Sequence, residues 1–171
     1  GFAFESGEVD AARDRYGEAL ELATGEAPIR ARVEQNLGIL ANIQGEHDVA
    51  QRHYEAALAG FESAGDVRGS AIAHHNLGMV SADRTDWDAA DRHYRRCLEL
   101  AASAGDVHLQ ALGLLNQGDV LLARRQLDAA RGNAEQALAI FNELGAELDK
   151  PDAYTLIGRV YREMGRAALA E

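Results

Sequence analysis

Three asparagines recur at a fixed interval of 40 residues: Asn36, Asn76 and Asn116. An amide side chain can both donate hydrogen bonds to a peptide backbone and accept them from it. Asparagine is a poor helix former, because its side chain competes for backbone hydrogen bonds. Its repetition within helical sequence therefore favours a row of amides available for binding. The open alternative is that each amide bonds a neighbouring helix or loop of its own chain.

The histidines and the cysteine do not form a recognisable reactive site. His74 and His75 are adjacent, so on a helix their side chains point about 100° apart and cannot chelate one ion together. His53 and His93 lie 40 residues apart, and we expect them on a solvated helix face rather than at a metal. Cys97 is the only cysteine, which excludes an internal disulfide. It is predicted to be a buried small residue rather than a nucleophile, because no His or Asp motif accompanies it.

Composition and motifs narrow the function further. The chain has 171 residues with 17 basic and 28 acidic side chains, so its formal charge is 17 − 28 = −11. Such a surface repels phosphates, which argues against direct nucleic-acid binding and mildly favours basic partners. There is no Walker-type glycine loop, HExxH sequence or paired-cysteine motif, so we predict no cofactor, no metal and no enzymatic activity. No apolar run of about 18 residues and no signal peptide is visible, which predicts a cytoplasmic protein without a membrane span.

A second periodicity indicates which elements position the asparagines. Gly38, Gly78, Gly118 and Gly158 are also 40 residues apart, and a fixed step of this size is typical of a repeat array. Each unit contains two helical patterns, so we predict an all-α solenoid of antiparallel helix pairs over residues 1–171. The predicted units are the end of one repeat at 1–24, full repeats at 25–64, 65–104 and 105–144, and a partial repeat at 145–171.

The second full unit illustrates the pattern. Helices are expected over Val67–Asp83 and Trp87–Ser103, because Gly65-Asp66 suits a helix C-terminus followed by the N-cap of the next helix. The second helix of a unit carries a small–aromatic–small ladder: Ala50, Tyr54 and Ala57, then Ala90, Tyr94 and Cys97. The third unit has Ala134 in place of tyrosine, preceded by Gly132, so we predict that this helix is the loosest element.

The mid-helix glycines need a compensation, because each costs about 1 kcal/mol relative to alanine in a helix interior. We attribute it to close approach of the two helices in a unit. The residues expected to supply the small opposing surface are Ala50, Ala90 and Ala130, with Ala168 or Ala170 in the last unit. A large side chain at Gly78 should therefore overpack the helix crossing.

The sequence begins and ends inside the pattern. Residues Gly1–Ser6 match the last part of a first helix, and Ala167-Ala168-Leu169-Ala170 match the start of a second helix. Terminal repeats normally carry a polar capping face, and neither end shows one. We expect a piece of a longer protein, or an array completed by self-association through its uncapped ends.

These residues resemble the tetratricopeptide repeat, in the long 40-residue form of kinesin light chains, Leu-Gly-Asn repeat adaptors and the sensor arms of bacterial regulators. The resemblance rests on the Asn-Leu-Gly triplets at 36–38 and 76–78, the Ala-Gly-Asp turns at 64–66 and 104–106, and the ladder. It implies a right-handed superhelix whose first helices line the concave wall. It also implies that the asparagines hold the main chain of an extended peptide without reading its side chains. The departures are Gln117 for Leu, Leu156 for Asn and Ala134 for Tyr.

On this interpretation, residues one helical turn on either side of each amide line a groove. They are Arg32, Gln35, Asn36, Ile39 and Ile43; Ile72, His75, Asn76, Met79 and Asp83; Leu112, Leu115, Asn116, Asp119 and Leu122; and Asp152, Thr155, Arg159 and Arg162. An apolar centre with arginines at its ends suits a peptide or an amphipathic helix, although half of the aliphatic residues fit the core equally well. The leading prediction is a protein–protein interaction scaffold that binds a peptide or partner helix here. The alternative is an effector-sensing or oligomerisation arm of a larger bacterial transcriptional regulator.

Overall fold

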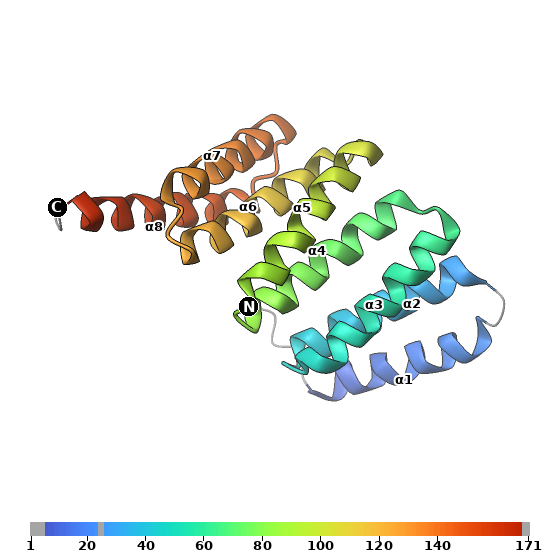
Figure 1. Ribbon diagram of the computed structural model, residues 1–171. Helices are drawn as coiled ribbons and strands as arrows, with labels where there is room; N and C mark the ends of the chain where they lie inside the picture. Colours follow the sequence, from blue (N-terminus) through green and yellow to red (C-terminus); the bar gives the residue numbers. More distant parts are fainter. Residues whose placement is uncertain (1–5, 24–25, 169–171) are drawn as a thin grey trace.

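A computed structural model describes residues 6–23 and 26–168, and these residues form eight α-helices. Successive helices pack as antiparallel hairpins that follow one another along the array (Figure 1). The helices are α1 (Ser6–Leu22), α2 (Ala27–Ile43), α3 (His47–Ala64), α4 (Val67–Asp83), α5 (Trp87–Ala104), α6 (Val107–Ala123), α7 (Leu127–Leu144) and α8 (Lys150–Ala168). The predicted all-α solenoid is confirmed.

The two sides of the stack differ. We call α2, α4, α6 and α8 the A helices, and α1, α3, α5 and α7 the B helices. Each A helix contacts the next A helix, whereas no such contact joins consecutive B helices in the described part of the chain. The stack is therefore tighter along the A helices, which form its inner wall, as the resemblance implies.

The turns that follow the B helices have a local cause. α3 is followed by Gly65, whose φ of 68° lies in the left-handed region that glycine adopts without strain. Asp66 then caps α4 by accepting a hydrogen bond of 2.8 Å from the backbone N–H of Gly69. The same arrangement recurs at Gly105-Asp106. The predicted bounds of α4 and α5 agree with the structure to within one residue.

The mid-helix glycines face aromatic rings. A Cβ placed on Gly38 would lie 2.6 Å from the Tyr54 ring, and one placed on Gly78 would lie 2.6 Å from the Tyr94 ring. The close approach predicted from the glycines is therefore present, but the nearest atoms belong to the tyrosine rings rather than to Ala50 and Ala90. The tyrosine four residues further along the B helix places its ring against the glycine.

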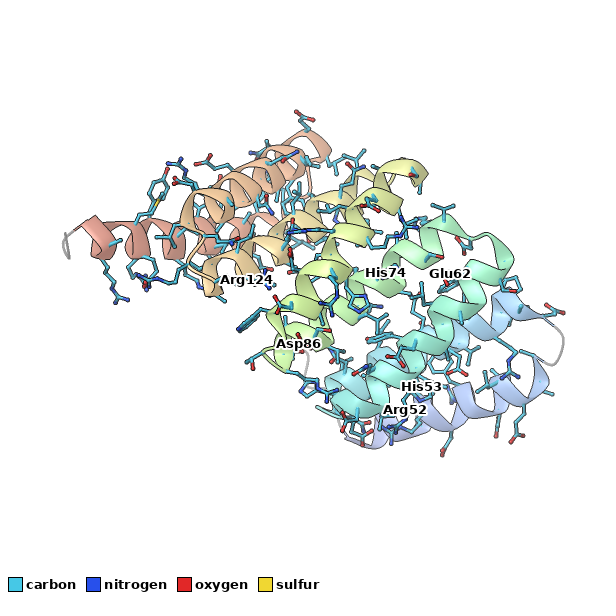
Figure 2. The ribbon with its side chains drawn as sticks, in the orientation of Figure 1. Arg52, His53, Glu62, His74, Asp86 and Arg124 are labelled. Carbon is cyan, nitrogen blue, oxygen red and sulfur yellow. The ribbon has the colours of Figure 1, made fainter. Side chains whose placement is uncertain are left out.

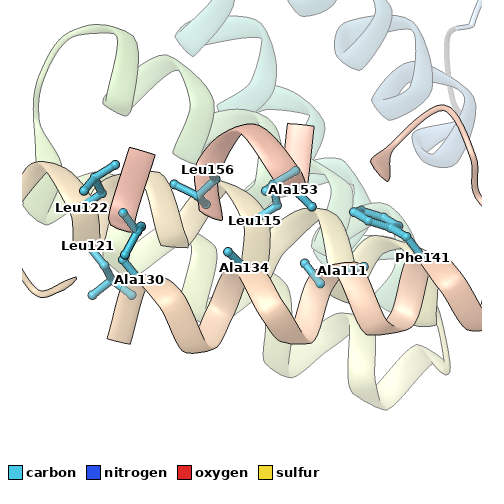
Figure 3. Close-up of a cluster of buried hydrophobic side chains, with 11 residues drawn as sticks. Ala111, Leu115, Leu121, Leu122, Ala130, Ala134, Phe141, Ala153 and Leu156 are labelled. Carbon is cyan, nitrogen blue, oxygen red and sulfur yellow. The ribbon is translucent and has the colours of Figure 1, made fainter. Parts of the chain in front are cut away.

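The third hairpin solves the same problem differently. A Cβ on Gly118 would lie 2.8 Å from Cδ2 of Leu156, whereas Ala130 approaches only through its carbonyl oxygen, at 3.5 Å. Leu156 comes from α8 and is 1% exposed, and Ala134 is fully buried in the same cluster (Figure 3). The helix predicted to be the loosest element is thus packed into a large buried apolar cluster.

The expectation for the C-terminal end is corrected, because Ala167 and Ala168 continue α8 instead of beginning a new helix. Ser6 is helical and belongs to α1, whereas residues 1–5 of the predicted preceding helix lie outside the described ranges. The turns after α2, α4 and α6 contain residues with φ of 76°, 59° and 62°, whereas the corresponding Gly165 stays helical. A Cβ placed on Gly158 of α8 would meet nothing within 4 Å in the described chain. The remaining end residues discussed above lie outside the described ranges, as does Gly25.

One further property concerns membranes. Within residues 6–23 and 26–168, none of the helices combines the length and the apolar character needed to cross a bilayer.

Candidate functional site

Four cavities lie along the wall formed by the A helices. The N-terminal cavity, of about 290 Å³, lies between α2 and α4. It is lined by Arg32, Gln35, Asn36, Phe61, Asp66, Arg68, Gly69 and Ile72. Asn36 is half-buried at this cavity, and four of the predicted groove residues therefore meet in one place.

The other three cavities have Arg159 in common and therefore lie beside one another. The central cavity, of about 340 Å³, is lined by Met79, Ala82, Asp83, Trp87, Tyr94, Asn116, Asp119, Ala123 and Arg159. The Asp152 cavity, of about 230 Å³, is lined by Leu115, Asn116, Asp119, Asp152, Thr155, Leu156 and Arg159. The arginine cavity, of about 340 Å³, is lined by Leu122, Ala123, Arg125, Arg159, Arg162, Glu163 and Arg166.

Several predicted groove residues lie elsewhere. Ile39 and Ile43 are 38% and 55% exposed on α2 and line none of these cavities. Leu112 packs against the apolar cluster that contains Leu115, which is itself only 6% exposed. The apolar centre expected for the groove thus belongs partly to the core.

The three amides are not equivalent. Asn116 lines two cavities, and its Nδ2 lies 2.8 Å from Nε2 of His75. Asn76 is 9% exposed, and its Nδ2 atom is buried without a hydrogen-bond partner. Only Asn36, which lines the N-terminal cavity, and Asn116 face open space. The amide row is present in register, but one member already bonds within the chain and another lies beneath the surface.

His75 lies beneath the surface of the A-helix wall. It is 9% exposed and its ring stands edge-on to Tyr94 with centroids 6.0 Å apart. Burial lowers the pKa of His75, and a hydrogen bond to Asn76 partly opposes the shift. In the neutral ring that burial favours, Nε2 can accept from the Asn116 amide. His75 thus orients Asn116 from below.

The central cavity contains one ion pair and a further carboxylate, Asp83. Arg159 on α8 pairs with Asp119 on α6. Burial raises the pKa of Asp119, and the Arg159 guanidinium opposes this while Asp152 adds to it. A polar pair at the meeting point of three cavities can bond the peptide groups and charged side chains of a ligand.

The other histidines do not form the solvated face that we expected. Nδ1 of His53 lies 2.7 Å from Glu34, and Nδ1 of His74 lies 3.0 Å from Nδ1 of His93. Both pairs are half-buried between the A and B helices of one hairpin, and Figure 2 labels His53 and His74 on successive hairpins. The expectation failed because this position of the B helix faces its A partner. Residues 6–23 and 26–168 contain no group of three or more side chains suited to hold a metal ion.

Cys97 agrees with its prediction. It is fully buried, and burial raises the pKa of its thiol to about 12. A thiol held protonated in this way is a poor nucleophile.

Sequence reasoning missed Trp87 and Arg125 as cavity residues. Trp87 begins α5 directly after the turn from α4, and His47 and Leu127 begin α3 and α7 at the equivalent position. The position of Trp87 in the sequence was the available signal, because a residue at the start of a B helix lies beside the end of the A helix that precedes it.

The comparisons with known proteins agree with this architecture. A family model described as tetratricopeptide repeat matches residues 1–63 and 69–143. The chain belongs to the tetratricopeptide repeat family. Its members are scaffolds for protein–protein interaction, and the chain is a scaffold of this kind. A comparison with curated proteins finds no match.

Two solved structures show the same fold. BtubC (BKLC) from P. vanneervenii superposes with a TM-score of 0.73 at 24% identity, covering 97% of this chain and 76% of that one. Aspartyl phosphate phosphatase F from Bacillus subtilis superposes with a TM-score of 0.82 at 16% identity, covering 95% of this chain and 45% of that one. The tetratricopeptide repeat chain thus spans less than half of the phosphatase, and likeness at this identity establishes the fold and brings no activity with it.

Proposed function

We propose that this tetratricopeptide repeat chain binds a peptide segment of a protein partner along the wall of its A helices. The observation that carries the proposal is that the central, Asp152 and arginine cavities adjoin one another at Arg159. Together they form a track along α6 and α8 that receives an amide from Asn116 and charged groups from Asp119 and Arg159. Concave tracks with a few convergent polar groups are the usual form of a peptide-binding site.

The state of Asn76 supports the same proposal. A buried donor without a partner costs about 1–3 kcal/mol, and Asn76 Nδ2 is such a donor. It stands in register between Asn36 and Asn116 on the same side of the A helices. A carbonyl of a bound main chain, reached by a change of rotamer, would supply the missing acceptor.

Random peptides displayed on phage, selected against the immobilised chain, test the proposal whatever the identity of the partner. We expect enriched peptides that lose at least about tenfold in affinity for an Asn36→Ala/Asn116→Ala double variant, because each amide contributes about 1 kcal/mol of hydrogen bonding. Alanine is the better helix former, so far-UV circular dichroism should show that the variant stays folded.

Asn142→Ala is the matched control, because Asn142 is exposed on the B helix α7, away from the wall. It should bind the same peptides as the parent chain. Failure to enrich any peptide, or equal binding by the double variant, would show that the A-helix wall is not the binding site.

A further inference from the structure

The arginine cavity concentrates positive charge in an acidic protein. Four arginines, Arg125, Arg159, Arg162 and Arg166, line a single cavity of about 340 Å³, although the chain as a whole carries a formal charge of −11. Such a local reversal of sign needs a reason, because charges on a solvated surface usually mix.

The ion pairs within the cavity do not neutralise it. Nη1 of Arg125 and Nη1 of Arg166 each lie 2.6 Å from an oxygen of the one Glu163 carboxylate. Arg159 pairs with Asp119. Four guanidinium groups thus face two carboxylates, which leaves a local charge of 4 − 2 = +2.

Arg162 carries much of this excess. It is exposed at the cavity, and no salt bridge to it is found among the described residues. A guanidinium has five N–H donors in a planar fork, so Arg125 and Arg166 also keep donors free after each bonds Glu163. The free donors suit a carboxylate, which accepts two parallel hydrogen bonds from a guanidinium.

We infer that the arginine cavity binds a carboxylate side chain, so that the peptide recognised by this wall carries aspartate or glutamate where it crosses the ends of α6 and α8. This inference rests on the proposed function and adds the chemical class of the ligand. A protein segment is favoured over a nucleic acid as the source of the negative charge, because the rest of the surface repels a polyanion.

The test extends the phage selection to three further variants. Arg162→Glu reverses the unpaired charge, Arg162→Lys keeps it, and Arg52→Glu on α3 makes the same change of net charge at an exposed site away from the cavity (Figure 2). We expect peptides enriched in Asp and Glu on the parent chain, on Arg162→Lys and on Arg52→Glu. Binding of these peptides to Arg162→Glu should fall about tenfold or more, as for the loss of a charged hydrogen bond, and should weaken with added salt.

Each other outcome decides against the inference. Peptides that depend on Asn36 and Asn116 but show no acidic excess, or that bind Arg162→Glu as well as the parent, would overturn the carboxylate site and leave the proposed function standing. An excess of Lys and Arg would do the same. The absence of any enriched peptide would overturn both. Displacement of the captured phage by a single-stranded oligonucleotide would assign the cavity to nucleic acid instead.

Discussion

The first two complete hairpins and the third solve one packing problem in two ways. In α2–α3 and α4–α5, a mid-helix glycine receives a tyrosine ring from its own B helix, Tyr54 or Tyr94. In α6–α7, the B helix has Ala134 instead, and the space at Gly118 is filled by Leu156 from α8. The contact has moved from within a hairpin to between neighbouring units.

The comparison leads us to expect that two departures from the repeat pattern are coupled. Ala134 leaves room beside Gly118, and Leu156, which stands where the earlier units have asparagine, occupies that room. The position that carries an amide in the earlier units is used here for packing, and Leu156 is 1% exposed.

A third departure is coupled in the same region. Leu37 and Leu77 are buried apolar residues, whereas Gln117 at the equivalent position donates to Asp91 at 2.9 Å and accepts from Asn133 at 3.0 Å. Asp91 is 5% exposed and is held by Arg95 at 2.7 Å as well. The third hairpin thus exchanges apolar contacts for a polar network that joins α5, α6 and α7.

The largest expected effect comes from removing the replacement side chain. Leu156→Asn restores the residue of the earlier units but vacates a fully packed site and buries an amide, so we expect a loss of about 4 kcal/mol in the free energy of unfolding, measured by urea titration. Leu148→Asn is the matched control, because Leu148 is 94% exposed and its change should stay within about 0.5 kcal/mol.

The coupling of Leu156 and Ala134 is tested by the double variant. Ala134→Tyr alone should cost about 1–3 kcal/mol by overpacking against Leu156. Combined with Leu156→Asn it rebuilds the contact of the earlier hairpins, so the double variant should be more stable than the sum of the single effects by at least about 1 kcal/mol. Additive effects would show that the two departures are independent.

The earlier hairpins can be broken at the glycine. Gly78→Leu places a side chain where even a Cβ would lie 2.6 Å from the Tyr94 ring, and we expect a loss of about 3 kcal/mol. Gly158→Leu makes the same change at the same register, where a Cβ meets nothing within 4 Å. This control should be neutral or more stable by up to about 1 kcal/mol, because leucine is the better helix former. Equal thermal melting of the two variants would contradict the packing account.

A smaller effect is expected in the polar network. Gln117→Leu restores the residue of the earlier hairpins but leaves Asp91 and Asn133 each without one hydrogen bond, so we expect a net loss of about 1 kcal/mol. The exposed Gln136 on α7 provides the control, and Gln136→Leu should change stability by less than about 0.5 kcal/mol. Stabilisation by Gln117→Leu would mean that the network does not offset the cost of burying it.

Periodicity and turn chemistry predicted the repeat and the bounds of α4 and α5, and the family resemblance implied that the A helices form the inner wall. The Gly65-Asp66 pair ends one helix and caps the next within a few residues, so its effect can be predicted from the local sequence. The sequence did not reveal that Leu156 fills the space beside Ala134. These residues lie on different helices, and their contact depends on the angle at which the two helices pack, which the sequence pattern does not give. The burial of Asn76 and His75 escaped prediction for the same reason, since one helical position separates the groove from the core.

The last prediction compares how the second and third hairpins affect stability at acid pH. The pKa of His74 is lowered from 6.5 to about 4 by burial, with the charges of His93 and Arg96 adding to the shift and Glu99 opposing it. The pKa of His93 is lowered as well, by burial and Arg92, against the opposite influence of Glu55 and Asp86. As pH falls below about 6.5, these histidines bind protons in the unfolded chain but stay neutral in the folded one. The free energy of unfolding therefore decreases progressively toward about pH 4.

The third hairpin has Leu114 and Asn133 at these positions, so His74→Leu/His93→Asn transplants its pair into the second. Melting temperatures measured from about pH 7 to about pH 5, above the range in which most carboxylates titrate, should then fall less steeply than those of the parent. His108→Gln is the control, because His108 is exposed and paired with Asp149 outside the hairpin interface. The melting temperature of this control should fall more steeply over this pH range than that of the double variant. If the double variant loses as much stability as the parent over this range, the acid sensitivity does not arise from the His74–His93 contact, and the two hairpins differ in packing alone.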